Sequence, residues 1–155
     1  MRILLLLTLL LSARAETLVV LGDSLTVGYG VEPTDAFPAR LGLPAAWRVV
    51  NAGVSGETSA GALERVPFIL RAKPDWVLVA TGANDGLRGI APERMQANLI
   101  AIIDGLRAGG ARVALAGMRL PENYGGGHAE AFAAVYPAVA AAKEVPLLPF
   151  LLEGV

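Results

Sequence analysis

A serine follows directly on a short apolar run near the start of the chain. Gly22-Asp23-Ser24-Leu25 comes after residues 18–21, which read Leu-Val-Val-Leu. A tight turn at the end of a buried strand would present the Ser24 hydroxyl at the edge of a sheet, where open α/β sheets build their sites. A hydroxyl in that position can attack an ester carbonyl if a base takes its proton and hydrogen-bond donors stabilise the resulting oxyanion.

Two further polar turns follow two more apolar runs and could supply such donors. Asn51-Ala52-Gly53 comes after residues 48–50, and Gly82-Ala83-Asn84-Asp85 comes after residues 76–80. Gly53 has no side chain, so its N–H could approach a reacting carbonyl closely. Asn84 carries an uncharged amide with two donor hydrogens. Each of these residue patterns alone is common in turns. The ends of successive parallel strands meet at one sheet edge, however, so the three turns are expected to lie together.

The elements that must position these residues alternate along the chain. Strands are predicted at residues 18–21, 48–50, 76–80, 112–116 and 145–148. Helices are predicted at residues 35–43, 59–72 (interrupted by Pro67), 92–108 and 129–143. This alternation is typical of right-handed β-α-β units with a parallel sheet. We therefore predict an α/β fold with a doubly wound, flavodoxin-like, five-stranded parallel sheet, and a flexible glycine-rich loop over residues 121–128 at the same edge.

The composition excludes several classes of function. The chain has 155 residues, of which 54% are hydrophobic and 17% charged, enough to fill the core of one domain. Its net charge is −1, so the chain has no excess of positive charge that would attract nucleic acid or an anionic membrane. There is no cysteine and a single histidine, His128. A thiol nucleophile and a thiolate or histidine-rich metal site are therefore excluded.

The first fifteen residues have the pattern of a secretory signal peptide. Met1-Arg2 is a basic start, residues 3–11 are almost entirely apolar, and Ala13-Arg14-Ala15 matches an A-x-A cleavage site. We predict a signal peptide over residues 1–15 with cleavage after Ala15, a single domain over residues 16–155, and a periplasmic or secreted location. The alternative is a membrane anchor, but a span needs about 20 apolar residues, so no stable membrane anchor is expected.

The polar turns also carry a resemblance to a known family. Residues 22–25, 51–58 and 82–89 closely resemble the first three sequence blocks of the GDSL-type (SGNH) hydrolases. Residues 119–125 and 145–150 look like the bacterial periplasmic arylesterase, acyl-thioesterase and lysophospholipase branch. The resemblance implies the SGNH-hydrolase fold and a serine esterase or thioesterase. Its substrates would be small-molecule acyl esters (aryl esters, acyl thioesters, lysophospholipids), and it would use no cofactor and no metal.

The same resemblance assigns roles to individual residues. Ser24 would be the nucleophile, and the oxyanion hole would be formed by the Ser24 N–H, the Gly53 N–H and the Asn84 side chain. The substrate loop would include Leu120, Pro121, Asn123 and Tyr124.

The base of this family and its orienting acid come from an Asp-x-x-His block after the last strand, and the 155 residues contain no such block. His128 aligns with a loop position instead. We expect the sequence to be a fragment of a longer reading frame; the alternative is a degenerate protein. Little esterase activity is expected, because loss of a triad member costs on the order of 10⁴–10⁶ in rate. Poor stability is also expected, because an uncovered apolar sheet face would meet water.

Three other functions remain open at this point. A carbohydrate O-acetyl esterase of the same family would share the site. A non-catalytic flavodoxin-like module could bind FMN or another phosphate ligand at the same edge, although residues 22–30 lack dinucleotide-binding spacing and no Walker pattern occurs. A catalytically dead partner protein would keep the fold without the chemistry.

Overall fold

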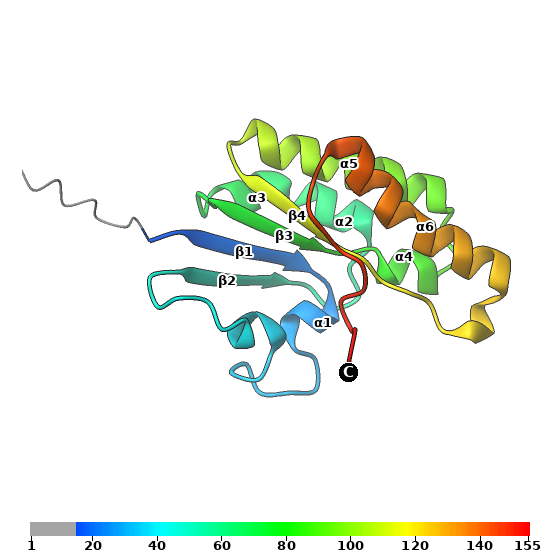
Figure 1. Ribbon diagram of the computed structural model, residues 1–155, viewed down its shortest axis with the longest axis horizontal. Coiled ribbons are helices and arrows are strands. Elements are labelled where there is room, and N and C mark those ends of the chain that lie inside the picture. Colours follow the sequence, from blue (N-terminus) through cyan, green and yellow to red (C-terminus); the bar gives the residue numbers. More distant parts are fainter. Residues whose placement is uncertain (1–14) are drawn as a thin grey trace, which may run out of the picture.

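A computed structural model describes residues 15–155, apart from the side chain of Glu122. The predicted signal peptide therefore lies outside the described residues except for Ala15. Five parallel strands form one sheet in the order β2-β1-β3-β4-β5 (Figure 1). This is the flavodoxin-like strand order, so the predicted fold is confirmed. The strands are β1 (Thr17–Gly22), β2 (Arg48–Gly53), β3 (Trp76–Ala80), β4 (Arg112–Ala116) and β5 (Leu147–Leu148).

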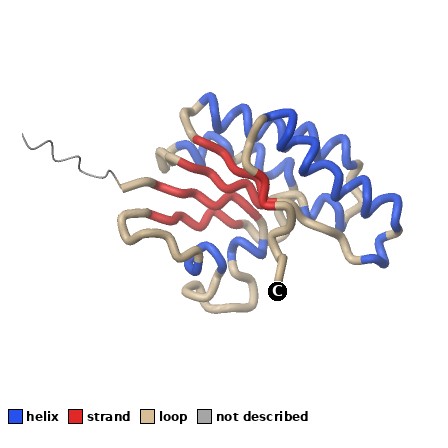
Figure 2. The backbone as a smooth tube through the Cα atoms, in the orientation of Figure 1, coloured by secondary structure: helices blue, strands red, loops and turns tan. Residues whose placement is uncertain are grey.

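The helices lie on both sides of this sheet but not evenly. Most of them cover one face, while the short helix α1 and the 3-10 helix η1 lie on the other side, near β2 (Figures 1 and 2). The covered face carries α2 (Ser59–Glu64), α3 (Val66–Leu70), α4 (Ala83–Leu87), α5 (Pro92–Ala108) and α6 (Gly126–Lys143). The other side carries α1 (Ser24–Val27) and η1 (Phe37–Arg40), and a second 3-10 helix, η2 (Glu122–Tyr124), precedes α6.

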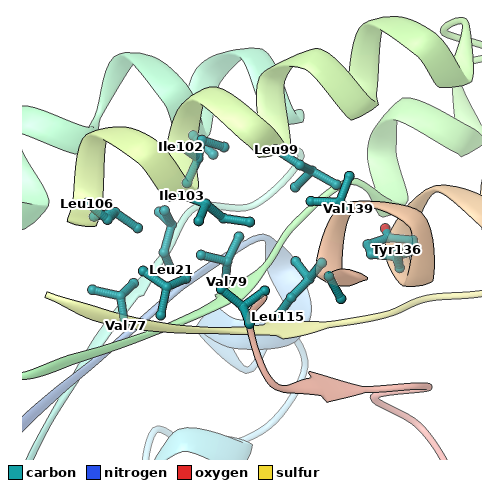
Figure 3. Close-up of a cluster of buried hydrophobic side chains, with 14 of the residues drawn as sticks. Leu21, Val77, Val79, Leu99, Ile102, Ile103, Leu106, Leu115, Tyr136 and Val139 are labelled. Carbon is teal, nitrogen blue, oxygen red and sulfur yellow. The ribbon is translucent and has the colours of Figure 1, made fainter. Parts of the chain in front are cut away.

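The main core lies between the sheet and the two long helices (Figure 3). Alternate residues of the strands point into it, and α5 presents a stripe at helical spacing. These side chains are fully buried and include Leu21, Val77, Val79, Leu115, Leu99, Ile102, Ile103 and Leu106. From α6, Tyr136 packs edge-on against Phe132 at a centroid distance of 5.5 Å. The core thus fixes the sheet edge from which the polar turns extend.

Several element boundaries differ from the sequence-based expectation. The helix expected at residues 35–43 is only the 3-10 helix Phe37–Arg40. Strand β2 continues through Gly53, because that residue pairs in register with Gly22 of β1. The segment 59–72 divides into α2 and α3 at Arg65, since Pro67 lies in the first turn of α3, where its missing N–H leaves no hydrogen bond unmade.

The glycine-rich segment is also more ordered than expected. Helix α6 begins at Gly126, three residues before the predicted start, so part of the predicted flexible loop is helical. Gly125 precedes this helix with φ of +83°, a conformation that favours glycine. The last strand is shorter than predicted, and only Leu147 and Leu148 pair with β4.

The second face of the sheet carries an apolar groove. Its volume is about 350 Å³, and it is lined by Leu18, Leu41, Leu43, Trp47, Trp76, Val77, Leu78, Ala114 and Pro146. The strand residues Leu18, Trp76 and Leu78 are only half-buried there. Among residues 15–155, no helix has the length and apolar character that crossing a membrane requires.

Candidate active site

Ser24 is the first residue of α1, immediately after the end of β1. Asp23 caps this helix, and its Oδ1 accepts a hydrogen bond from the Leu25 N–H at 3.0 Å. Gly22 permits the sharp turn, because a Cβ at that position would lie 2.6 Å from the Ala80 carbonyl oxygen. The turn leaves Ser24 half-buried, with its backbone N–H at the N-terminal end of the helix.

Gly53 occupies a different environment from the one expected for an oxyanion donor. Its N–H donates to the Asn51 Oδ1 at 3.0 Å, while the Asn51 Nδ2 donates to the Thr26 carbonyl at 2.6 Å. A Cβ on Gly53 would lie 2.8 Å from the Asp23 carbonyl oxygen and against the Val27 N–H. Gly53 therefore lets the end of β2 pack against α1, and its N–H is already engaged.

Gly56, three residues further on, has the free donor that Gly53 lacks. Its φ is +75°, and no acceptor for its N–H occurs among the described residues. Its carbonyl accepts a hydrogen bond from the Arg88 Nη2 at 2.8 Å. Gly56 belongs to the same motif as Gly53, residues 51–58, but the sequence prediction does not include it; a second glycine in this polar turn is the signal that points to it.

Asn84 lies in the first turn of α4, directly beyond the end of β3. Its Nδ2 donates to the Glu57 carbonyl at 2.9 Å and lies 3.5 Å from the Asp23 Oδ2. The bond to Glu57 is the shorter of the two, and the contact with Asp23 lies at the outer limit of hydrogen-bond distance, so the second amide hydrogen is only weakly held. Gly82 precedes the helix with φ of +113°, and a Cβ there would lie 2.6 Å from the Tyr136 hydroxyl.

Ser24 and Asn84, which the sequence places at one sheet edge, line the same cavity. Its volume is about 260 Å³, and its remaining lining residues are Asp23, Leu25, Ala83, Leu87, Met118, Arg119, Leu120 and Pro121. Two residues of the predicted substrate loop, Leu120 and Pro121, are therefore brought to the serine. Gly53, Asn123 and Tyr124 do not line this cavity. Most of the lining is apolar.

Burial dominates the electrostatics of Asp23. The side chain is 2% exposed, and this desolvation raises the pKa of its carboxyl above the ordinary value of 3.8. The Leu25 N–H opposes the change by stabilising the carboxylate, and the nearby Glu57 adds to it. Burial likewise raises the pKa of the Tyr136 phenol, whose hydroxyl donates to the Thr81 carbonyl at 3.2 Å.

His128 lies in the first turn of α6 and is not among the residues that line the cavity with Ser24. Its Nε2 lies 3.1 Å from the Gly86 carbonyl oxygen. Within residues 15–155, the Ser24 hydroxyl forms no hydrogen bond with any side chain or backbone group. The structure thus places Ser24 beside the Asn84 amide in a largely apolar cavity, while His128 contacts the Gly86 carbonyl of α4.

A parallel sheet in flavodoxin order, with a serine after β1 and an asparagine after β3, is the arrangement expected for the hydrolase family that the sequence resembles. Residues 20–154 match the GDSL-like Lipase/Acylhydrolase family. The chain belongs to this family, and the resemblance found in the sequence is confirmed.

Comparison with individual members of the family shows how close the relationship is. The chain is 47% identical to Esterase TesA of Pseudomonas aeruginosa over 92% of its own length and 74% of that protein. It is 45% identical to Thioesterase 1/protease 1/lysophospholipase L1 of Escherichia coli (strain K12), over 93% of its length and 71% of that protein. The crystal structure of AlinE4, an SGNH-hydrolase family esterase, superposes with a TM-score of 0.85 at 36% identity, covering 91% of this chain and 79% of that one.

Proposed function

We propose that this chain hydrolyses acyl esters and acyl thioesters with Ser24 as the nucleophile. The observation that carries the proposal is the shared cavity of Ser24 and Asn84 at the carboxyl edge of the sheet. The relatives support the substrate class, since they include an esterase, a thioesterase/lysophospholipase and, in Vibrio mimicus, an arylesterase at 39% identity.

The reaction proceeds in two steps. The Ser24 Oγ attacks the acyl carbonyl carbon and gives up its proton to a base, and the carbonyl oxygen becomes an oxyanion. Collapse of the tetrahedral intermediate expels the alcohol or thiol, which takes up the proton. Water then attacks the acyl-enzyme, releases the carboxylic acid and restores the serine.

Three donors are proposed to stabilise the oxyanion. They are the Ser24 N–H, the second hydrogen of the Asn84 Nδ2, and the Gly56 N–H in place of the Gly53 N–H. Gly56 replaces Gly53 because the Gly53 N–H is bound to Asn51, whereas the Gly56 N–H has no acceptor among the described residues. Losing one donor of this kind costs about 10²–10³ in rate.

The residues that line the cavity favour a substrate with an apolar acyl group. Its wall beyond the serine is formed by Leu25, Leu87, Met118, Leu120 and Pro121. An acyl chain buried against such side chains gains about 0.8 kcal/mol for each CH₂ group removed from water. We propose that Leu120 and Pro121 contact the acyl chain, and that Asn123 and Tyr124 of η2 contribute through the position of this loop.

We also propose that the 155 residues by themselves hydrolyse esters slowly. The Ser24 hydroxyl has no base beside it in the described residues, and the His128 Nε2 is directed at the Gly86 carbonyl. The serine without its base retains only the contribution of the oxyanion donors and of binding.

Hydrolysis of 4-nitrophenyl butyrate and of an acyl-coenzyme A by the purified chain tests both proposals, with Ser24→Ala as the control. We expect a small rate that Ser24→Ala abolishes and that added imidazole raises by supplying an external base. A fluorophosphonate should label wild-type Ser24 slowly. Equal rates for wild type and Ser24→Ala in both conditions would refute the assignment of Ser24. Rapid turnover without imidazole would refute the slow rate instead.

A periplasmic or secreted location is proposed on the signal-like residues 1–15. Expression of the gene in a Gram-negative host, followed by fractionation and N-terminal sequencing, tests it. We expect a periplasmic protein that begins at Glu16; an unprocessed cytoplasmic chain would contradict the proposal.

A further inference from the structure

A buried carboxylate lies next to Asn84 and has no role in the reaction described above. Asp85 is 1% exposed, and among residues 15–155 no cation lies within ion-pair distance of it. A buried carboxylate is costly unless hydrogen bonds replace its water. Asp85 receives two, from the Ser59 N–H to its Oδ2 at 2.7 Å and from the Ser59 hydroxyl to its Oδ1 at 2.6 Å.

Ser59 is itself fixed by its surroundings. It is the first residue of α2 and is fully buried. Thr58, which precedes it, forms no side-chain capping bond, so the Asp85 carboxylate caps this helix from another element. The Asn98 Nδ2, on α5, donates to the Ser59 hydroxyl oxygen at 2.9 Å. Helices α2, α4 and α5 are therefore joined by one buried polar network.

This network lies beside the hydrogen bond that holds Asn84. The Asn84 Nδ2 donates to the Glu57 carbonyl, two residues before Ser59. Adjacent residues of α4 thus bind alternate residues of a single segment, residues 57–59. Neighbouring side chains on a helix point about 100° apart. The Asn84 bond to Glu57 and the Asp85 bonds to Ser59 therefore approach this segment from different directions. Together they fix the rotation of α4 about its axis, and with it the second amide hydrogen of Asn84.

We propose that Asp85 is a positioning residue for the oxyanion site, acting through its hydrogen bonds with Ser59 to hold Asn84 against the Glu57 carbonyl. This inference rests on the proposed hydrolase function. Asp85 touches neither substrate nor reacting atoms, and its effect is carried entirely by the orientation of the Asn84 amide.

The position of the Asn84 amide can be measured without any activity. In the ¹⁵N-labelled chain, the side-chain amide pair of Asn84 is assigned by its loss in Asn84→Ala. We expect Asp85→Asn and Ser59→Ala to shift this pair and to speed its hydrogen exchange with water at least about tenfold, as a locally loosened segment does. An unchanged pair in both folded variants would overturn the proposal. Ser59→Ala removes only one of the two bonds, so it remains informative if the Asp85 variant does not fold.

Hydrolysis of 4-nitrophenyl butyrate, with imidazole as external base, gives the second readout. Asp85→Asn should lower kcat about tenfold and leave KM within about twofold. This loss in kcat is smaller than the roughly 10²–10³-fold loss expected when the Asn84 donor itself is removed. The double variant Asn84→Ala/Asp85→Asn should be no slower than Asn84→Ala alone, because residues that act as a unit are not additive. Additive losses would overturn the proposal.

A matched control is available at the opposite end of the sheet. Asp75 also accepts a hydrogen bond from a backbone group, the Thr17 N–H, at 2.8 Å. Asp75→Asn should lower stability without changing kcat or the Asn84 amide pair. If wild type and Ser24→Ala hydrolyse the ester equally, the proposed function fails, whereas the amide measurement still decides the role of Asp85.

Discussion

Asp23 precedes the proposed nucleophile Ser24, and it is the buried ionisable group of that turn. Burial raises the pKa of its carboxyl in the folded chain, so folding favours the protonated form. The stabilisation from this group is fully present below its unfolded pKa, near 3.8, and is lost as pH rises through the higher folded pKa. We therefore expect Asp23→Asn, which stays neutral and can still cap α1, to become more stable relative to wild type as pH rises.

Urea denaturation of both proteins at pH 3.5 and pH 7 measures this difference. The gap in the free energy of unfolding between Asp23→Asn and wild type should be larger at pH 7. A gap that is constant, or that shrinks with pH, would show that the carboxylate is better accommodated than its burial implies.

Gly53 is predicted from the sequence as an oxyanion donor, whereas in the structure it packs closely against α1 and its N–H binds Asn51. Gly53→Ala should destabilise the chain by several kcal/mol, because its Cβ would meet the backbone of α1. Gly30 is a matched control: its φ is +86° but a Cβ there has no neighbour within 4 Å, so Gly30→Ala should cost only about 1–2 kcal/mol. Thermal and urea unfolding followed by circular dichroism compare the two, and equal losses would contradict the packing role of Gly53.

The sequence predicts that Ser24 and Asn84 lie at one sheet edge because each follows a strand, and parallel strands end at a common edge. It does not predict that the Gly53 N–H is engaged. That bond requires β2 to continue in register with β1 through Gly53 and the Asn51 side chain to fold back toward it. A pairing register depends on the partner strand, which no local pattern around Gly53 contains.

At the scale of elements, α5 is predicted at its observed bounds, since it combines a proline in its first turn, a stripe of apolar residues and a terminal glycine pair. The start of α6 is missed because three successive glycines have low helix propensity. In the structure Gly126 and Gly127 are nevertheless helical, and a Cβ on either would meet no atom within 4 Å.

The double variant Gly126→Ala/Gly127→Ala should therefore be more stable than wild type by about 1–2 kcal/mol, the gain in helix propensity at two open positions. Urea denaturation measures this gain. If the segment instead acts as a flexible gate over the cavity, the same variant would change the preference among 4-nitrophenyl esters of different acyl length. A stabilised chain with an unchanged preference would confine the segment to a structural role.

For the whole molecule, the two faces of the sheet differ in how well they are covered. The face under α5 and α6 is closed, while the groove on the other face leaves Leu18, Trp76 and Leu78 half-buried. Apolar patches of this kind bind hydrophobic dyes and promote association. We expect the purified 155-residue chain to raise the fluorescence of anilinonaphthalene sulfonate under native conditions and to unfold at a low temperature with weak cooperativity.

A pair of variants assigns the dye signal to this face. Leu78→Gln places a polar group in the groove and should lower the fluorescence, whereas Phe68→Gln should leave it unchanged. Phe68 is the matched control because it is 63% exposed on α3, which packs on the opposite side of the sheet. A soluble monomer that unfolds in one sharp transition and binds no dye would contradict the expected poor stability. It would show that the remaining contacts of η1 and Trp47 suffice to shield the second face of the sheet.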